Sequence, residues 1–213
     1  MSRSVERTAS RRRLLCLGMA LPALTIAGCQ LPGSGPPPRE FRVTQKSTFP
    51  EDLPKADWSL MVERPNANRS IDTPRIARTS GVEMQYYAGA TWIDRPPVMI
   101  EPLIIQSFRS SGAIDVVADR RSGLRPDFLL QTDITAFEAM HRASGPPDVR
   151  AAMSATLIRM PRREVVGTTQ IDHTVTAQAN DLGSIAVAFD EALGDVLKRL
   201  VEWTLRSGEA ASA

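Results

Sequence analysis

The side chain whose surroundings most clearly suggest chemistry is the thiol of Cys29. It follows an uncharged apolar run at residues 14–27, and three arginines at 11–13 precede that run. The two residues directly before the thiol are Ala and Gly, small enough for a peptidase to approach the backbone closely. The apolar run is too short to span a bilayer, which takes about 20 residues. The pattern predicts a cleaved signal segment over residues 1–28 and lipid attachment at Cys29.

The string Ile26-Ala-Gly-Cys29 resembles the lipobox of bacterial lipoproteins, in which the thiol is diacylglyceryl-modified before the chain is cut. We therefore expect covalent acyl lipid on Cys29, with an ordinary transmembrane anchor as the alternative. Gln30 resembles the residue found in outer-membrane lipoproteins, because retention at the inner membrane usually takes Asp there. Residues 10–15 also resemble a twin-arginine motif without its usual Phe and Lys, so both the Sec and the twin-arginine export routes stay open.

The residue types that support catalysis or metal binding form no recognisable site. His141 and His173 are the only histidines and lie far apart in the sequence, without metal-ligand spacing. Once Cys16 leaves with the signal and Cys29 is acylated, no thiol remains for a disulfide or for catalysis. Residues 33–35 (Gly-Ser-Gly) lie in a proline-rich stretch rather than at a strand-to-helix turn, and no phosphate-binding loop is present. We expect a protein that is not an enzyme and has no metal or cofactor besides its lipid.

The distribution of charge argues against nucleic acid as a partner. The whole chain has a formal net charge of +2, but the predicted signal holds five of its 26 Lys and Arg residues and one of its 24 Asp and Glu residues. The mature chain would therefore carry a net charge of about −2, without the basic excess that nucleic-acid binding requires.

Hydrophobic patterning predicts one domain between two tails. Residues 29–39 read as a lipidated cysteine followed by a Pro/Gly tether, 40–206 as the folded domain, and 207–213 as a disordered tail. Alternating or β-branched runs predict strands at 41–44, 59–63, 82–87, 114–118, 128–139, 149–159 and 165–176. Apolar residues at three- and four-residue spacing predict helices at 94–112 and 184–205.

The first predicted helix has a clear start, in which Asp94 would cap the helix and Pro96-Pro97 would occupy its first turn. The resulting order is β-β-β-α-β-β-β-β-α. This order favours an α+β fold with a mainly antiparallel sheet and two helices packed on one of its faces.

The most distinctive stretch of the chain is aromatic and runs from Tyr86 to Pro97. One interpretation is a rigid contact patch for a protein partner, made by Tyr86, Tyr87, Trp92 and Arg95. The other interpretation, which we favour, is structural. Tyr86 and Trp92 would then pack the strand onto the following helix, while Arg95 would pair with a nearby carboxylate.

Several strings along the chain, taken together, resemble the ABC-type transport auxiliary lipoprotein family, which includes the PqiC lipoproteins. The specific strings are Ile71-Asp-Thr-Pro-Arg-Ile-Ala and Tyr86-Tyr-Ala-Gly-Ala-Thr-Trp-Ile-Asp-Arg-Pro-Pro. A strand at Trp58-Ser-Leu-Met-Val-Glu-Arg-Pro, a helix ending Phe108-Arg-Ser-Ser-Gly and a last helix ending near Trp203 accompany them. The resemblance covers essentially all of residues 29–205.

The resemblance implies a non-enzymatic protein with an α/β layer fold that works with a permease, an ATPase and an MCE-domain protein. Together these would move phospholipid or other hydrophobic molecules between the inner and outer membranes. The lipoprotein would be the docking component, anchored on the periplasmic face of the outer membrane. Association with further copies of itself, as a homo-oligomer, is also expected. The alternative is a tethered structural or regulatory lipoprotein that acts on a cell-wall enzyme. Of the family's functional positions, only Cys29 transfers to this sequence.

Overall fold

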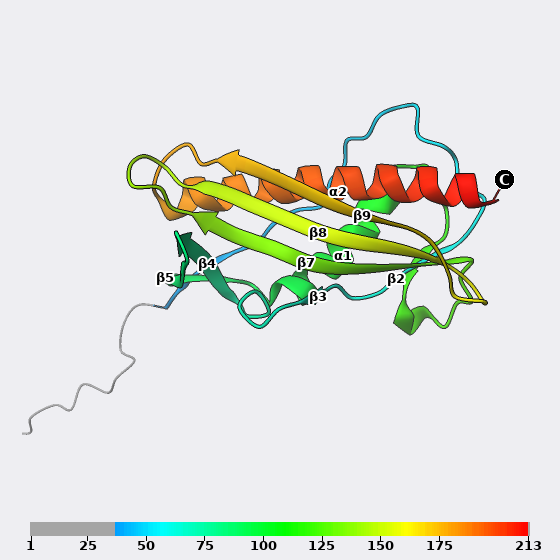
Figure 1. Cartoon of the computed structure of the whole chain (residues 1–213), viewed down its shortest axis with the longest axis horizontal. Helices are drawn as coiled ribbons and strands as arrows, with labels where there is room; N and C mark the ends of the chain where they lie inside the picture. The colour runs from blue at the N-terminus through cyan, green and yellow to red at the C-terminus, as the bar shows by residue number, and fades with distance from the viewer. Residues whose placement is uncertain (1–36, 213) are drawn as a thin grey trace, which may run out of the picture. The chain divides into compact units, whose positions relative to one another are not determined.

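A computed structural model describes residues 37–212 (Figure 1). The predicted signal segment, Cys29 and most of the predicted tether lie outside the described residues. In chain order the elements are β1 (Arg39–Phe41), β2 (Leu60–Val62), β3 (Asn66–Ala67), β4 (Arg75–Ser80), β5 (Glu83–Trp92), α1 (Pro96–Ser110), β6 (Val117–Asp119), the short 3-10 helix η1 (Arg120–Ser122), β7 (Phe128–Met140), β8 (Asp148–Arg159), β9 (Glu164–Thr176) and α2 (Leu182–Ser212).

Three long strands, β7, β8 and β9, form an antiparallel meander that is the largest part of the sheet. Their register pairs Phe128 with Arg159 on β8, and Asp148 with Thr176 on β9. Burial along much of β7 and β8 alternates with a period of two, because successive side chains point to opposite faces of a sheet. The sequence predicted all three strands to within about one residue at each end.

The other edge of β7 is shared by three short strands that all run parallel to it. β2, β3 and β4 pair in turn with Phe128–Leu130, Asp133–Ile134 and Glu138–Met140. β6 is parallel to β2, β1 is parallel to β5, and β4–β5 is an antiparallel hairpin. The sheet is therefore mixed, and the prediction of a mainly antiparallel sheet is wrong. Five strands, rather than the predicted three, precede α1.

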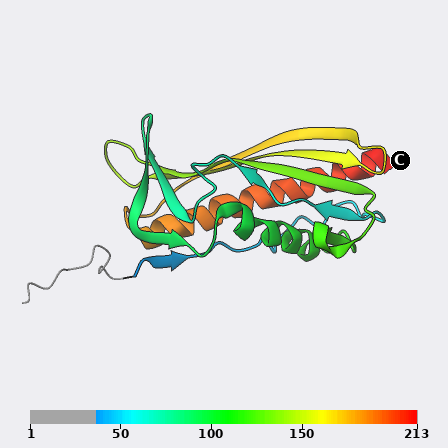
Figure 2. The same ribbon diagram turned by 90° about the horizontal axis from the view of Figure 1, so that it is seen from below.

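Both predicted helices are present and contact each other. In Figure 2, α2 lies between the β7–β9 strands and α1, and the contacts of the two helices agree with that view. The core is one cluster to which both helices and the sheet contribute, and its largest fully buried side chains include Phe108, Phe137, Phe189 and Leu130. The coarse expectation of an α+β fold with two helices is confirmed.

The start of α1 and the end of α2 differ from the sequence prediction. The N-cap of α1 is Arg95, not Asp94, and Asp94 instead accepts a hydrogen bond from the Arg95 N–H at 2.7 Å. The two prolines that open the helix have no N–H to be capped, and the first free N–H, that of Val98, donates to the Arg95 carbonyl at 2.9 Å. At the other end, residues 207–212 were expected to be disordered but continue α2 to Ser212.

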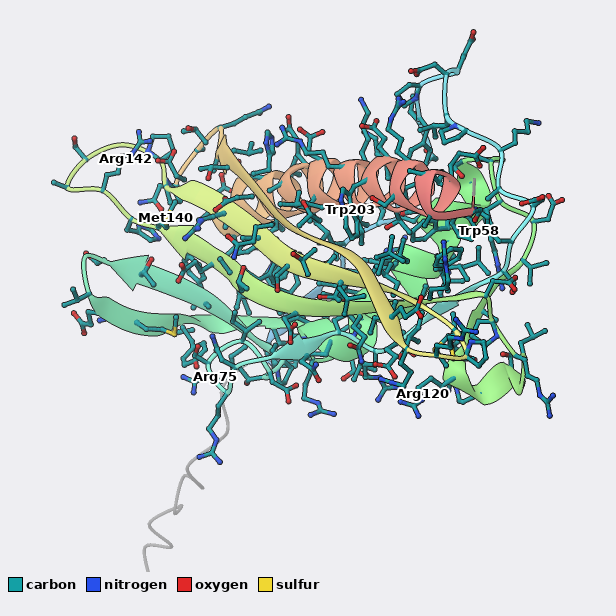
Figure 3. All side chains as sticks on the ribbon, turned by 45° about the vertical axis from the view of Figure 1, so that its right-hand side comes forward. Trp58, Arg75, Arg120, Met140, Arg142 and Trp203 are labelled. Carbon is teal, nitrogen blue, oxygen red and sulfur yellow. The ribbon has the colours of Figure 1, made fainter. Side chains whose placement is uncertain are left out.

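Gly208 explains why α2 extends so far. It is buried, and a Cβ at this position would lie 2.9 Å from Cε2 and Cη2 of Trp58, so only glycine lets the helix lie against the indole. Trp58 itself is buried near the C-terminal end of α2 (Figure 3). This contact fixes the last turns of the helix to the strand that begins at Leu60.

We expect alanine substitutions at two glycines of α2 to change stability in opposite directions. Gly208→Ala should destabilise the domain by about 1–3 kcal/mol because the added methyl overlaps the indole. Gly194→Ala should stabilise it by about 0.5–1 kcal/mol, because alanine favours a helix interior and the nearest atom to its Cβ is a Lys46 carbon 4.0 Å away. Urea unfolding followed by circular dichroism measures both changes. Equal effects at the two positions would contradict the packing argument.

Candidate functional site

The two strings that are most specific to the family resemblance meet on one surface of the domain. The loop that carries Ile71-Asp-Thr-Pro is held in shape by Asn68, whose side-chain oxygen accepts hydrogen bonds from the N–H groups of Ser70 (3.0 Å) and Ile71 (3.2 Å). Ile71 is buried and anchors the loop in the core. The Tyr86 hydroxyl, from β5, donates to the Ser70 carbonyl at 3.1 Å. The loop and the hairpin are therefore fixed to each other.

Arginine side chains surround this junction. The Arg75 guanidinium lies 3.8 Å from the centre of the Tyr86 ring, within the range of a cation–π contact (Arg75 is labelled in Figure 3). Arg95 donates to the Asp72 carboxylate at 3.2 Å. Asp72, Arg75, Tyr86 and Arg95 are together called the arginine–tyrosine cluster below. Their side chains remain partly exposed, so the cluster forms part of the surface.

A second ion pair lies beside the cluster. Arg64 donates to Glu101 of α1 at 2.7 Å, and the Glu101 side chain is only 10% exposed. The Glu101 carboxylate raises the pKa of Arg64 above its ordinary value, mainly through this hydrogen bond. A hollow of about 250 Å³ lies between the two ion pairs, with Pro65 and Pro97 in its wall. Rigid prolines and paired charges make this a shaped, polar surface.

Tyr87 points away from the arginine–tyrosine cluster, because adjacent residues of a strand face opposite sides. Its hydroxyl lies 2.5 Å from Nε2 of His141, and Arg78 lies 5.7 Å from its ring centre. Burial raises the pKa of Tyr87 to about 12 and lowers the pKa of His141, and Arg78 lowers the latter further. Both side chains are therefore neutral near pH 7, and a hydrogen bond joins the hydroxyl to the ring nitrogen. The contact ties β5 to the residue that follows β7.

We expect this contact to weaken in mild acid. Because the pKa of His141 is lower in the folded chain than its ordinary 6.5, the unfolded chain binds more protons below that pH, and stability falls as pH drops. Urea midpoints measured from pH 7.5 to 5.5 should fall for the wild type. His141→Gln should remove the part of that fall that belongs to this residue, and an identical pH profile in the two proteins would contradict the assignment.

Trp92 does not belong to the surface. It is 2% exposed, and its ring centre lies 5.2 Å from that of Phe137 on β7 and 5.0 Å from that of Phe189 on α2. This burial favours the structural interpretation of Trp92 over partner contact. Its ring contacts join β5 to β7 and to α2. The four residues singled out in the aromatic stretch thus lie in three places. Tyr86 and Arg95 belong to the arginine–tyrosine cluster, Tyr87 contacts His141, and Trp92 lies in the core.

Asp72, Arg75 and His141 were not predicted from the sequence as members of these contacts. Each lies more than ten residues from its tyrosine or arginine partner, and only the hairpin register and the β4–β7 pairing bring them together. Within residues 37–212, no group of three or more His, Cys, Asp or Glu side chains is placed to hold a metal ion. No helix of that segment has the length and apolar character needed to cross a membrane.

Comparison with known families decides the assignment. The model of the ABC-type transport auxiliary lipoprotein component matches residues 42–201, nearly the whole described domain. The chain belongs to this family. The resemblance inferred from the sequence strings is thereby confirmed. The family is one of auxiliary transport components and not of enzymes, and its members are lipoproteins, which indicates a lipid-anchored protein of the cell envelope that associates with a transport system.

Solved structures place this auxiliary lipoprotein among similar folds. A protein of Xanthomonas campestris assigned to the family DUF330 is 30% identical with a TM-score of 0.78, over 82% of this chain and 98% of its own. An uncharacterised protein shares the fold, with 13% sequence identity and a TM-score of 0.55; the match covers 79% of this chain and 97% of that protein. A PelC dodecamer from Paraburkholderia phytofirmans has a TM-score of 0.40 at 15% identity, over 71% and 95%, which is too distant to support an argument about assembly. No curated protein matches the chain.

Proposed function

We propose that this auxiliary lipoprotein is the outer-membrane docking component of an MCE-type system that moves phospholipid or another hydrophobic compound between the two membranes. The family match over residues 42–201 is the observation that carries the proposal. It assigns the described domain to an ABC-type transport system. Acyl chains on Cys29 would hold the domain at the outer membrane, and two or more such chains give stable anchoring.

The short tether supports a partner that comes close to the membrane. Residues 29–38 precede β1, and fully extended they would span about 35 Å. A domain confined to that distance meets a periplasm-spanning protein only where that protein approaches the outer membrane. This is the position of a docking component rather than of a free periplasmic carrier.

The arginine–tyrosine cluster is the proposed contact surface for the MCE-domain protein. Arginine and tyrosine are enriched where binding energy concentrates in protein interfaces. The Arg95 side chain is 49% exposed and its partner Asp72 is 35% exposed, so both can meet another protein without unfolding the loop. The fixed loop and hairpin present these groups in one geometry, which lowers the entropy lost on binding.

Crosslinking in the membrane, followed by purification of the lipoprotein and mass spectrometry, tests the docking role. We expect an MCE-domain protein, a permease and an ATPase to be enriched over an unrelated lipoprotein control. Recovery of a peptidoglycan synthase without any MCE protein would favour the alternative of a cell-wall regulator. Recovery of neither would contradict the docking role.

Arg95→Glu should lower capture of the MCE protein by about tenfold, since it reverses a charge at the centre of the proposed contact. The fold should persist, because an exposed ion pair contributes only about 0–1 kcal/mol. Arg125→Glu is the matched control, an exposed arginine on the loop after η1, well away from the cluster in the sequence. Equal capture by both variants would move the contact surface elsewhere while leaving the docking role intact.

A further inference from the structure

An apolar groove lies along α1, next to the hollow beside the arginine–tyrosine cluster, with which it shares Val98. Its walls come from three segments: the chain after β1, the turn after β5, and the outer face of α1. The apolar side chains that line it are Val43, Ile93, Val98, Met99, Pro102 and Leu103. Ile93 is 56% exposed, although most large apolar side chains of the domain are buried. The core therefore does not account for the placement of this side chain.

The volume and lining of the groove fit a small hydrophobic ligand. The groove encloses about 450 Å³, within the roughly 300–1,000 Å³ typical of ligand sites, which combine mainly apolar walls with a few polar groups. A hollow of this size accepts a slender chain. A partner helix would instead need a long, shallow apolar strip, and the polar side chains of Gln45 and Gln106 interrupt any such strip here.

Two opposite charges lie at the groove. Arg42 and Asp94 both line it and both are exposed. Among residues 37–212, Arg42 forms no ion pair, whereas nine other arginine or lysine side chains do. Asp94 accepts one hydrogen bond, from the backbone N–H of Arg95, and forms no ion pair among the described residues. One cation and one anion beside an apolar hollow complement a ligand with a lipid tail and a zwitterionic headgroup.

We propose that this groove binds one acyl chain of a zwitterionic glycerophospholipid such as phosphatidylethanolamine. Arg42 would contact the phosphate, and Asp94 would contact the ammonium group. The inference rests on the proposed function, because it names the lipid class that a docking component of such a system would contact. One wall of the groove begins with Arg42, the residue after β1, so it lies near the N-terminal end of the described domain in the chain.

Photocrosslinking from a defined lipid tests the proposal. The lipidated protein is reconstituted into vesicles of phosphatidylethanolamine and phosphatidylglycerol that contain a trace of phosphatidylethanolamine with a diazirine on one acyl chain. After irradiation, mass spectrometry should place the crosslinks within residues 42–45 and 93–106. Crosslinks confined to other segments would overturn the proposal.

Paired variants separate the groove from general hydrophobic contact. Ile93→Glu should reduce crosslinking by about tenfold, because it places a charge against the acyl chain. Val187→Glu is the matched control, since Val187 on α2 is 60% exposed and lies outside the groove. Circular dichroism checks that both variants fold. Equal crosslinking by the wild type and Ile93→Glu would overturn the proposal.

A second pair tests the headgroup. Arg42→Gln should lower crosslinking several-fold, whereas Arg125→Gln should not. A diazirine-labelled phosphatidylglycerol probe should crosslink less than the phosphatidylethanolamine probe, because Asp94 repels a net negative headgroup. Equal yields from the two probes, or no effect of Arg42→Gln, would overturn the headgroup assignment.

The protein's own anchor is the competing source of an acyl chain. In a separate preparation the anchor carries the diazirine through a labelled fatty acid supplied during growth. Crosslinks from the anchor to the groove, without crosslinks from vesicle lipid, would overturn the proposal in favour of the anchor.

Capture of the MCE protein is measured on the same samples. Intact capture without lipid crosslinks rejects the groove alone, whereas lipid crosslinks without an MCE partner support the groove and reject the docking role.

Discussion

Replacing Trp92 by alanine is expected to destabilise the domain by about 3–5 kcal/mol, a large fraction of the stability of a domain of this size. Trp92 is 2% exposed and lies against two phenylalanines that come from β7 and α2. Phe137 and Phe189 also contact each other, with ring centres 4.8 Å apart, so the indole completes a three-ring cluster. Its removal leaves a cavity that neither a strand nor a long helix can move to fill.

The adjacent residue provides the control for this prediction. Ile93 is 56% exposed, so Ile93→Ala should change stability by no more than about 0.5 kcal/mol. Urea unfolding followed by circular dichroism measures both variants without relying on tryptophan fluorescence, which the substitution itself alters. A small effect of Trp92→Ala would mean that the aromatic cluster is not part of the core. It would restore the interpretation of Trp92 as a partner-contact residue.

Replacing Cys29 by serine should abolish acylation and leave the signal segment uncut. A hydroxyl cannot substitute for the thiol that receives the diacylglyceryl group, and cutting follows that modification in lipoproteins of the kind this sequence resembles. Growth with an alkyne fatty acid, followed by dye coupling and gel electrophoresis, should show a labelled, shortened chain for the wild type. The variant should appear as an unlabelled, longer chain. The label is the better readout, because an uncut apolar run could still hold the chain at a membrane.

Cys16→Ser is the matched control for lipid attachment. Cys16 is the only other cysteine and lies inside the apolar run, where acylation before cutting is not expected. This variant should be labelled and shortened like the wild type. Loss of label in both variants, or in neither, would contradict the assignment of Cys29 as the lipidated residue.

The sequence predicted the parts of the fold that carry their own periodic signal. The strands at 128–140, 148–159 and 164–176 alternate over a dozen residues, and both helices show a continuous apolar stripe. β3 and β4 were missed because they are two and six residues long and are defined by pairing with β7, whose residues lie about 60 positions further along the chain. No local pattern encodes such a pairing. The helical end of α2 was missed because Ser-Gly-Glu-Ala reads as a frayed end unless the indole beside Gly208 is known.

The candidate site was predictable only in part. The sequence pointed to the aromatic stretch and to Arg95, and it gave a carboxylate as one interpretation of the Arg95 partner, which the Asp72 contact confirms. The sequence could not show that Tyr86 lies at the arginine–tyrosine cluster and Tyr87 against His141. Which tyrosine lies where depends on which face of the strand meets the loop at Asn68–Pro74. The apolar groove has no sequence signal of its own, since three separate segments line it.

The three parallel strands along one edge of β7 lead us to expect a particular order of assembly. β2, β3 and β4 pair with residues 61–68 positions away, whereas β7, β8, β9 and α2 follow one another closely in the chain. Contacts of such high contact order form slowly, because a long loop must close before they stabilise anything. β2, β3 and β4 are synthesised before β7, and we expect them to join the sheet late. Until β7 is present, β2 and β3 lack this partner, whereas β4 already has β5 as its hairpin partner.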